Sequence, residues 1–203
     1  MEPDDFYRPG SRRLQQEFGT GALAAHLARR YVLDALEDQH VDWIRGADAV
    51  WVATVSDDGQ PECSYKGGLP GFVRVPDRRC LEIPSYDGNG MYRTLGNAAG
   101  GARIGLLFLF PETPSKLRVN GACEVSTDAG VLAGHHGAEA VVRVTIEQVF
   151  ENCPRYLHDP GTGGHSRDCP RPDYRPPAAA WKQKPEYEQL LPARPAAAGR
   201  ERE

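Results

Sequence analysis

The sequence lacks the features of several large functional classes. Its 203 residues include no apolar run close to the ~20 residues that span a membrane. The N-terminal stretch MEPDDFYRPGSRR has no apolar segment of the kind found in signal peptides. Lys and Arg number 24 against 28 Asp and Glu, so the net charge of -4 gives no basic face for nucleic acid. We therefore expect a cytoplasmic protein that binds neither a membrane nor a nucleic acid.

Cysteine is also scarce, and its pattern argues against two further classes. The 5 cysteines are odd in number and scattered, so they indicate no disulfide framework, and no CxxC pair indicates zinc. The adjacent His135 and His136 have no cysteine or carboxylate neighbours, and we therefore expect no metal site. The chain also has no P-loop, no Rossmann GxGxxG and no Ser/His/Asp arrangement.

The chain is long enough for one domain with a substantial core. We predict an N-terminal arm over residues 1–19 and a domain over residues 20–158 that begins with helices. Residues 159–203 are predicted to be a Pro/Gly-rich C-terminal tail that is partly disordered. The spacing of Leu23 and Leu27 predicts a helix from Thr20, and a second helix is predicted over residues 38–44.

About six or seven β-branched or apolar runs separated by turn signals predict an antiparallel barrel or sandwich instead of βαβ units. The predicted strands cover residues 49–55, 62–66, 72–75, 80–84, 102–110, 116–126 and 140–150. A short helix is predicted over residues 91–99. The run at 102–110, ARIGLLFLF, is almost continuously apolar, so we predict that this strand is buried on both faces.

A turn of Asp87, Gly88, Asn89 and Gly90 precedes the predicted helix at Met91. Gly and Asn tolerate a left-handed backbone, so successive N–H groups can point inward, and a helix start adds partial positive charge. The turn therefore predicts an anion site, with an ordinary turn and N-cap as the alternative interpretation. The basic residues that could join such a site are Lys66, Arg93, Lys116 and Arg118.

Two neighbouring patterns bear on the same site. Lys116, Arg118 and Asn120 share one strand face by their alternation, so they could converge on a phosphate or a ring edge. The two glycines that follow Lys66 permit close backbone approach of a flat ligand, or else they form a plain turn.

Several motifs in this order resemble the pyridoxamine 5'-phosphate oxidase-like family of FMN-binding split barrels. The motifs are CSYKGG, DGNGM and RVNG, together with VATVSDDGQPE, ARIGLLFLF and the ENCPRY segment. The resemblance covers residues 49–156 and is greatest to an uncharacterised bacterial subgroup. It implies a mainly β fold: a six-stranded antiparallel Greek-key split barrel with peripheral helices.

The resemblance also implies a homodimer that holds FMN in clefts between its subunits. The strand that includes Lys66 would run along the flavin ring, and the strand end at Ser85 and the turn after it would reach the ribityl chain and the phosphate. With Arg93 added from the turn, the FMN-binding candidates are Cys63, Ser64, Tyr65, Lys66, Pro84, Ser85, Asn89, Gly90, Met91, Arg93 and Lys116. No catalytic residue is identified.

The sequence departs from the oxidase proper at the phosphate. An Arg-Lys pair holds the phosphate in that enzyme, whereas Asn89 and Gly90 stand at the corresponding place here. Phosphate binding would then depend on backbone N–H groups and on Lys66 or Arg93, which argues against pyridoxamine phosphate oxidase activity itself. We expect an FMN-dependent oxidoreductase of unknown substrate; the alternative is a protein that binds FMN or the deazaflavin F420 without turnover.

Overall fold

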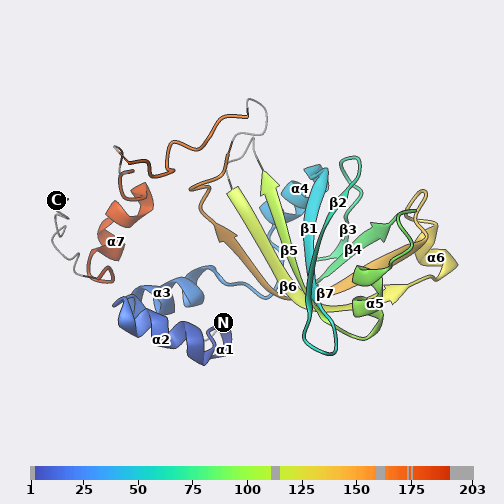
Figure 1. The fold of residues 1–203 in the computed structure, drawn as a ribbon, viewed down its shortest axis with the longest axis horizontal. Helices are drawn as coiled ribbons and strands as arrows, with labels where there is room; N and C mark the ends of the chain where they lie inside the picture. The colour runs from blue at the N-terminus through green and yellow to red at the C-terminus, as the bar shows by residue number, and fades with distance from the viewer. Residues whose placement is uncertain (1–2, 111–114, 159–162, 173, 175, 193–203) are drawn as a thin grey trace. The chain divides into compact units, whose positions relative to one another are not determined.

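The computed structural model describes residues 3–110, 115–158, 163–172, 174 and 176–192 (Figure 1). These residues form two compact units, one over residues 33–165 and the other over residues 1–32 with the residues from 166 onward. The predicted boundaries at 19/20 and 158/159 differ from this division. The loop predicted at 111–114 and the tail segments 159–162 and 193–203 lie outside the described residues.

The larger unit is built on one antiparallel sheet, as the sequence predicts. Its strands are β1 (Ala49–Val55), β2 (Pro61–Gly67), β3 (Arg74–Asp77), β4 (Cys80–Ser85), β5 (Arg103–Phe110), β6 (Ser115–Ser126) and β7 (Ala140–Asn152). Their order in the sheet is β2-β1-β5-β6-β7-β4-β3, so β1 and β5 are neighbours although β2, β3 and β4 lie between them in sequence (Figure 1).

The expected number of six strands is wrong, because the described sheet has seven. The shortest strand is β3, which pairs with β4 through Arg74 and Glu82 and, after a register shift, through Asp77 and Cys80. β3 lies at the edge of the sheet and includes Pro76, which an edge strand accommodates because its outer N–H positions need no partner.

The core of the larger unit lies on one face of the sheet. In β5, Ile104, Leu106 and Phe108 are buried, whereas the alternate residues Leu107 and Leu109 are only half-buried. The prediction that this strand is buried on both faces is therefore wrong. Its side chains point alternately to either side, and within one chain only one side is covered by the core.

Three helices accompany the sheet: α4 (Asp38–Gly46), α5 (Arg93–Ala99) and α6 (Ala129–Leu132). α4 covers the predicted helix at 38–44, and its Ile44 is buried in the core. The α4 start is fixed by His40, whose Nδ1 accepts a hydrogen bond from the Glu37 backbone N–H at 3.1 Å. α5 begins at Arg93, two residues after the predicted start at Met91, because Tyr92 adopts a left-handed backbone with φ of 49°.

The smaller unit contains α1 (Pro3–Phe6), α2 (Pro9–Glu17), α3 (Gly21–Tyr31), the 3-10 helix η1 (Ala180–Gln183) and α7 (Pro185–Glu188). The predicted arm therefore includes two helices, and Pro9 at the first position of α2 favours a helix start there. The predicted helix from Thr20 is α3. Within this unit Trp181 packs edge-on against Tyr187, whose hydroxyl lies 2.6 Å from that of Tyr31.

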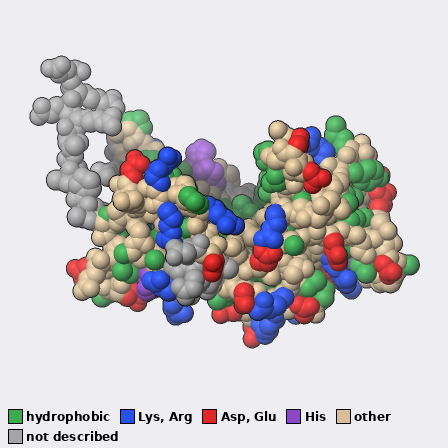
Figure 2. Space-filling view, turned by 90° about the horizontal axis from the view of Figure 1, so that it is seen from below, with side chains coloured by type: hydrophobic (Ala, Val, Ile, Leu, Met, Phe, Trp, Pro, Cys, Tyr) green, Lys and Arg blue, Asp and Glu red, His purple; other side chains and the backbone are tan. Residues whose placement is uncertain are grey.

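The surface carries charges of both signs. On the face shown in Figure 2, Lys and Arg side chains are interspersed with Asp and Glu. In the part of the chain that the structure describes, no helix combines the length and the apolar character needed to cross a membrane.

Candidate functional site

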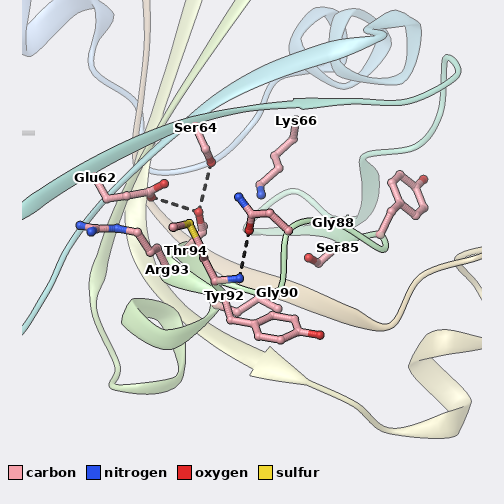
Figure 3. A pocket seen from close by; sticks show the side chains of 13 residues that line it. Glu62, Ser64, Lys66, Ser85, Gly88, Gly90, Tyr92, Arg93 and Thr94 are labelled. Carbon is pink, nitrogen blue, oxygen red and sulfur yellow. Dashed lines mark hydrogen bonds between the residues drawn. The ribbon is translucent and has the colours of Figure 1, made fainter.

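A cavity of about 170 Å³ lies between β2, the end of β4 and the segment that leads into α5 (Figure 3). Residues from all three elements line the cavity, and the first and last of them, Glu62 and Leu95, are 33 positions apart in the sequence. The lining residues are Glu62, Ser64, Lys66, Ser85, Tyr86, Gly88, Asn89, Gly90, Met91, Tyr92, Arg93, Thr94 and Leu95.

β2 contributes one of its two faces to this cavity. Its exposure alternates strictly, with Glu62, Ser64 and Lys66 half-buried and the residues between them exposed. Because successive side chains of a strand point to opposite sides, Cys63 and Tyr65 face away from the cavity. Tyr65 packs instead against Trp51 of β1, with ring centroids 5.3 Å apart.

The predicted turn forms the opposite wall. Gly90 has φ of 72°, a left-handed conformation that glycine adopts without strain. The Asn89 side chain accepts a hydrogen bond from the Met91 backbone N–H at 3.0 Å, which closes the turn. Among the residues that the structure describes, no protein acceptor pairs with the backbone N–H groups of Gly88, Asn89 or Gly90. The wall therefore presents unpaired donors.

A hydrogen-bonded network underlies the other end of the cavity. Glu62 Oε2 accepts from the Thr94 hydroxyl at 3.0 Å and from the Thr54 hydroxyl at 3.3 Å. Thr54 in turn accepts from the Asn97 amide at 2.9 Å, and Thr94 Oγ1 lies 3.1 Å from Ser64 Oγ. Both threonines are buried, so α5, β1 and β2 hold the Glu62 carboxylate in a fixed position.

Arg93 lies on the Glu62 side of the cavity (Figure 3). Its charge also acts on Asp58 in the turn between β1 and β2. The pKa of Asp58 is lowered chiefly by a hydrogen bond from the Ser56 hydroxyl, and the Arg93 guanidinium lowers it further. This effect of Arg93 is the smallest of the influences on the pKa of Asp58.

The structure brings together most of the predicted FMN-binding residues. Those that line the cavity are Ser64, Lys66, Ser85, Asn89, Gly90, Met91 and Arg93. Pro84 lines a small adjoining cavity with Lys66 and Ser85. Gly88 was named only as part of the predicted turn, and sequence reasoning missed the other lining residues, namely Glu62, Tyr86, Tyr92, Thr94 and Leu95. Strand alternation was a signal for Glu62, since it shares a face with Ser64 and Lys66.

The strand that carries Lys116 does not contribute to this cavity. Lys116 Nζ donates to the Arg155 carbonyl at 3.1 Å, the Arg118 guanidinium lies over the Phe150 ring, and Asn120 donates to Gln148. These three side chains share a face, as predicted, but their contacts lie along β7 and the segment after it. Within one chain these side chains do not line the cavity, and their convergence on a phosphate or a ring edge stays a prediction.

Two other predicted features have structural explanations. A Cβ on Gly68 would lie 2.5 Å from the Phe72 side chain, so this glycine permits close packing of Phe72. His135 is buried and pairs with Glu82, their Nε2 and Oε2 atoms lying 3.2 Å apart. In the described ranges, no three His, Cys, Asp or Glu side chains are grouped so as to hold a metal ion.

Several solved structures are similar to this chain. A search of curated proteins returned no match. Among solved structures, the HupZ protein of Group A Streptococcus is similar at 22% identity and a TM-score of 0.47, over 57% of this chain and 93% of that one. A Lactobacillus delbrueckii protein shares 27% identity at a TM-score of 0.46, over 58% of this chain and 95% of that one. An FAD-binding protein of Mycobacterium smegmatis shares 15% identity at a TM-score of 0.42, over 59% and 97%.

The family comparison extends over more of the chain. Residues 36–191 match the model of the family described as pyridoxamine 5'-phosphate oxidase. The matched range includes every strand of the sheet and every residue that lines the cavity. The chain therefore belongs to the pyridoxamine 5'-phosphate oxidase family.

Proposed function

We propose that this protein is a flavoprotein that binds FMN in the cavity between β2 and the turn at residues 87–90, and that it is an oxidoreductase of unknown substrate. One observation carries the proposal: a cavity in a member of this family in which Lys66 faces a turn with unpaired backbone N–H groups. A cation and convergent N–H donors are the groups that bind a phosphate in proteins.

The donor set fits the FMN phosphate without the Arg-Lys pair of the oxidase proper. The N–H groups of Gly88, Asn89 and Gly90 are free to donate, and the left-handed Gly90 keeps the turn open to a close approach. Lys66 adds a charge-assisted hydrogen bond. The Ser85 hydroxyl at the end of β4 is a further donor at this end of the cavity.

The chain's own residues bind and orient, and FMN, when bound, supplies the hydride-transfer chemistry. Tyr86, Met91 and Tyr92 line the cavity and are exposed in the single chain, so they are available to cover a bound ligand and exclude water. The polar network around Glu62 fixes the opposite end. Pyridoxamine phosphate oxidase activity itself is not proposed, because Asn89 and Gly90 stand where that enzyme has its basic pair.

We further propose that the site is completed in a homodimer with FMN at the subunit interface. The cavity of about 170 Å³ is smaller than the roughly 300–1,000 Å³ of typical ligand pockets, so one chain does not enclose a whole flavin nucleotide. The face of the sheet away from the core carries Tyr65, which is 60% exposed, and the half-buried Leu107 and Leu109. A second copy on this face would cover these apolar side chains.

A second candidate is binding without turnover, of either FMN or the deazaflavin F420. The turn supports it, because backbone donors hold a phosphate but supply no acid or base, and the carboxylate of Glu62 is engaged in a network. Competition between FMN and F420, followed by flavin fluorescence, separates the two cofactors. Reduction of the bound flavin by NADPH and its reoxidation by oxygen would favour the oxidoreductase.

Replacing Gly90 with valine tests the turn. A β-branched residue is strained at φ of 72°, so the turn should change shape and its N–H groups should be displaced. We expect the Kd for FMN to rise severalfold in a fluorescence-quenching titration. Gly46→Ala, at the end of α4 with open space around its Cα, is the matched control and should bind as the wild type does. Normal FMN affinity of the Gly90 variant would show that the turn is only structural.

A further inference from the structure

We propose that Glu62 and Ser64 form an acceptor subsite that binds the hydroxyl groups of the ligand's polyol chain, which in FMN is the ribityl chain. This inference rests on the proposed function, since it concerns the same cavity. The Glu62 carboxylate and the Ser64 hydroxyl, on one face of β2, would favour ligands that carry a polyol chain. The argument comes from the direction of each hydrogen bond in the network beneath the cavity.

The hydrogens of this network can be placed because each hydroxyl has only one. An ionised carboxylate only accepts hydrogen bonds, so Thr94 and Thr54 both donate to Glu62 Oε2. Thr54 meanwhile accepts from the Asn97 amide, which can only donate through nitrogen. Because the Thr94 hydrogen is engaged with Glu62, the 3.1 Å contact between Thr94 and Ser64 requires Ser64 to donate.

The network therefore leaves two hydrogen-bond acceptors, on Ser64 and Glu62, available to a ligand in the cavity. The single hydrogen of Ser64 is used by Thr94, which leaves the lone pairs of its oxygen available. Within the described residues, Glu62 Oε1 has no hydrogen-bond partner, whereas Oε2 has two. A ligand group that binds here must donate hydrogen bonds, and adjacent hydroxyls on a carbon chain meet two neighbouring acceptors.

Charge places this subsite apart from the phosphate. Glu62, Ser64 and Lys66 follow one another on the cavity face of β2, so their Cα atoms are about 7 Å apart from one to the next. Figure 3 shows Lys66 on the side of Gly88 and Ser85, and Glu62 on the side of Thr94 and Arg93. No carboxylate among the lining residues opposes Lys66 at its end, whereas at the other end the Glu62 carboxylate offsets the Arg93 guanidinium (Figure 3). A phosphate therefore favours the Lys66 end, and the chain that joins phosphate to ring passes Ser64 and Glu62.

Glu62→Gln tests the acceptor subsite directly. It replaces one acceptor atom in the cavity with a donor, while the side chain keeps nearly the same size and shape. The two threonine hydroxyls retain the amide oxygen at the Oε2 position, so the NH₂ group takes the place of Oε1. We expect Kd to rise about tenfold for FMN and for riboflavin, and to stay unchanged for lumiflavin, which has the ring but no ribityl chain. Fluorescence-quenching titrations with the three flavins on the full chain give these values.

The other outcomes are equally specific. If Glu62 merely repelled the phosphate, Glu62→Gln would tighten FMN binding and leave riboflavin unaffected, which would overturn the inference. An equal loss for lumiflavin would overturn it too, because the contact would then be to the ring. Ser64→Ala should also weaken the binding of FMN and riboflavin but not of lumiflavin, by a smaller factor. Glu124→Gln removes the same charge at an exposed position of β6 and serves as the control.

Failure of the proposed function would look different. If the wild-type chain quenched none of the three flavins, the flavoprotein proposal itself would fail, and the acceptor subsite with it. If the wild type bound FMN while Glu62→Gln and Ser64→Ala bound FMN and riboflavin as tightly as the wild type, only the subsite would be contradicted. Thermal unfolding of each variant shows that the folded state is retained.

Discussion

Gly121→Ala is expected to lower the free energy of unfolding by more than about 3 kcal/mol, although it adds a single methyl group. A Cβ at Gly121 would lie 2.0 Å from the Thr145 carbonyl oxygen of β7, and backbone atoms cannot move away without breaking the sheet. The close approach arises at the register shift between β6 and β7, where Asn120 pairs with Gln148 but Gly121 pairs with Ile146.

Urea unfolding followed by circular dichroism measures this effect. Gly46→Ala in the same unit adds the same methyl group where no atom lies within 4 Å, and its unfolding midpoint should stay close to that of the wild type. A Gly121→Ala protein as stable as the wild type would mean that β6 and β7 are farther apart at the bulge than the structure shows.

Lys66→Ala is expected to raise the Kd for FMN about tenfold to a hundredfold, which corresponds to the ~1.5–3 kcal/mol of a charge-assisted hydrogen bond. Lys66 faces the cavity from β2 opposite the turn, and no other lysine lines the described cavity. Riboflavin, which has no phosphate, should bind the variant and the wild type with similar affinity. The comparison of the two flavins therefore isolates the contact with the phosphate.

Two further variants complete that test. Lys184→Ala removes the same charge at a position that does not line the cavity, and its affinity for FMN should match the wild type. Lys116→Ala tests the proposed dimer: Lys116 does not line the cavity of its own chain, so a rise in the Kd for FMN would indicate a contact from a second subunit. Equal FMN affinity for Lys66→Ala and wild type would remove Lys66 from the phosphate site.

Sequence patterns predicted the sheet because the strands carry their own signals. The apolar runs and the turns between them gave the strand positions and the antiparallel class, which the structure confirms. The residues predicted a strand at the position of β3, whereas the family resemblance implied six strands in all, one fewer than the described sheet has. Strand order was less accessible, because the pairing of β1 with β5 depends on contacts between residues about 50 positions apart.

The site was predicted in part for similar reasons. Two residues could be recognised from the local sequence. Lys66 is a charged residue at the end of a predicted strand, and Gly90 is a glycine in a polar turn. Cys63 and Tyr65 were included among the FMN-binding candidates because every residue from 63 to 66 was chosen. The alternation of β2 places both side chains on the face away from the cavity. Thr94 could not be found from the sequence, because its role depends on how α5 packs against β1 and β2.

The most direct test of the account is the visible absorption spectrum of the purified full-length protein after incubation with FMN and removal of free flavin. The account predicts a yellow protein whose spectrum is that of bound flavin, with the flavin fluorescence quenched. A protein that remains colourless after this treatment would contradict the proposal that the cavity between β2 and the turn at residues 87–90 is an FMN site.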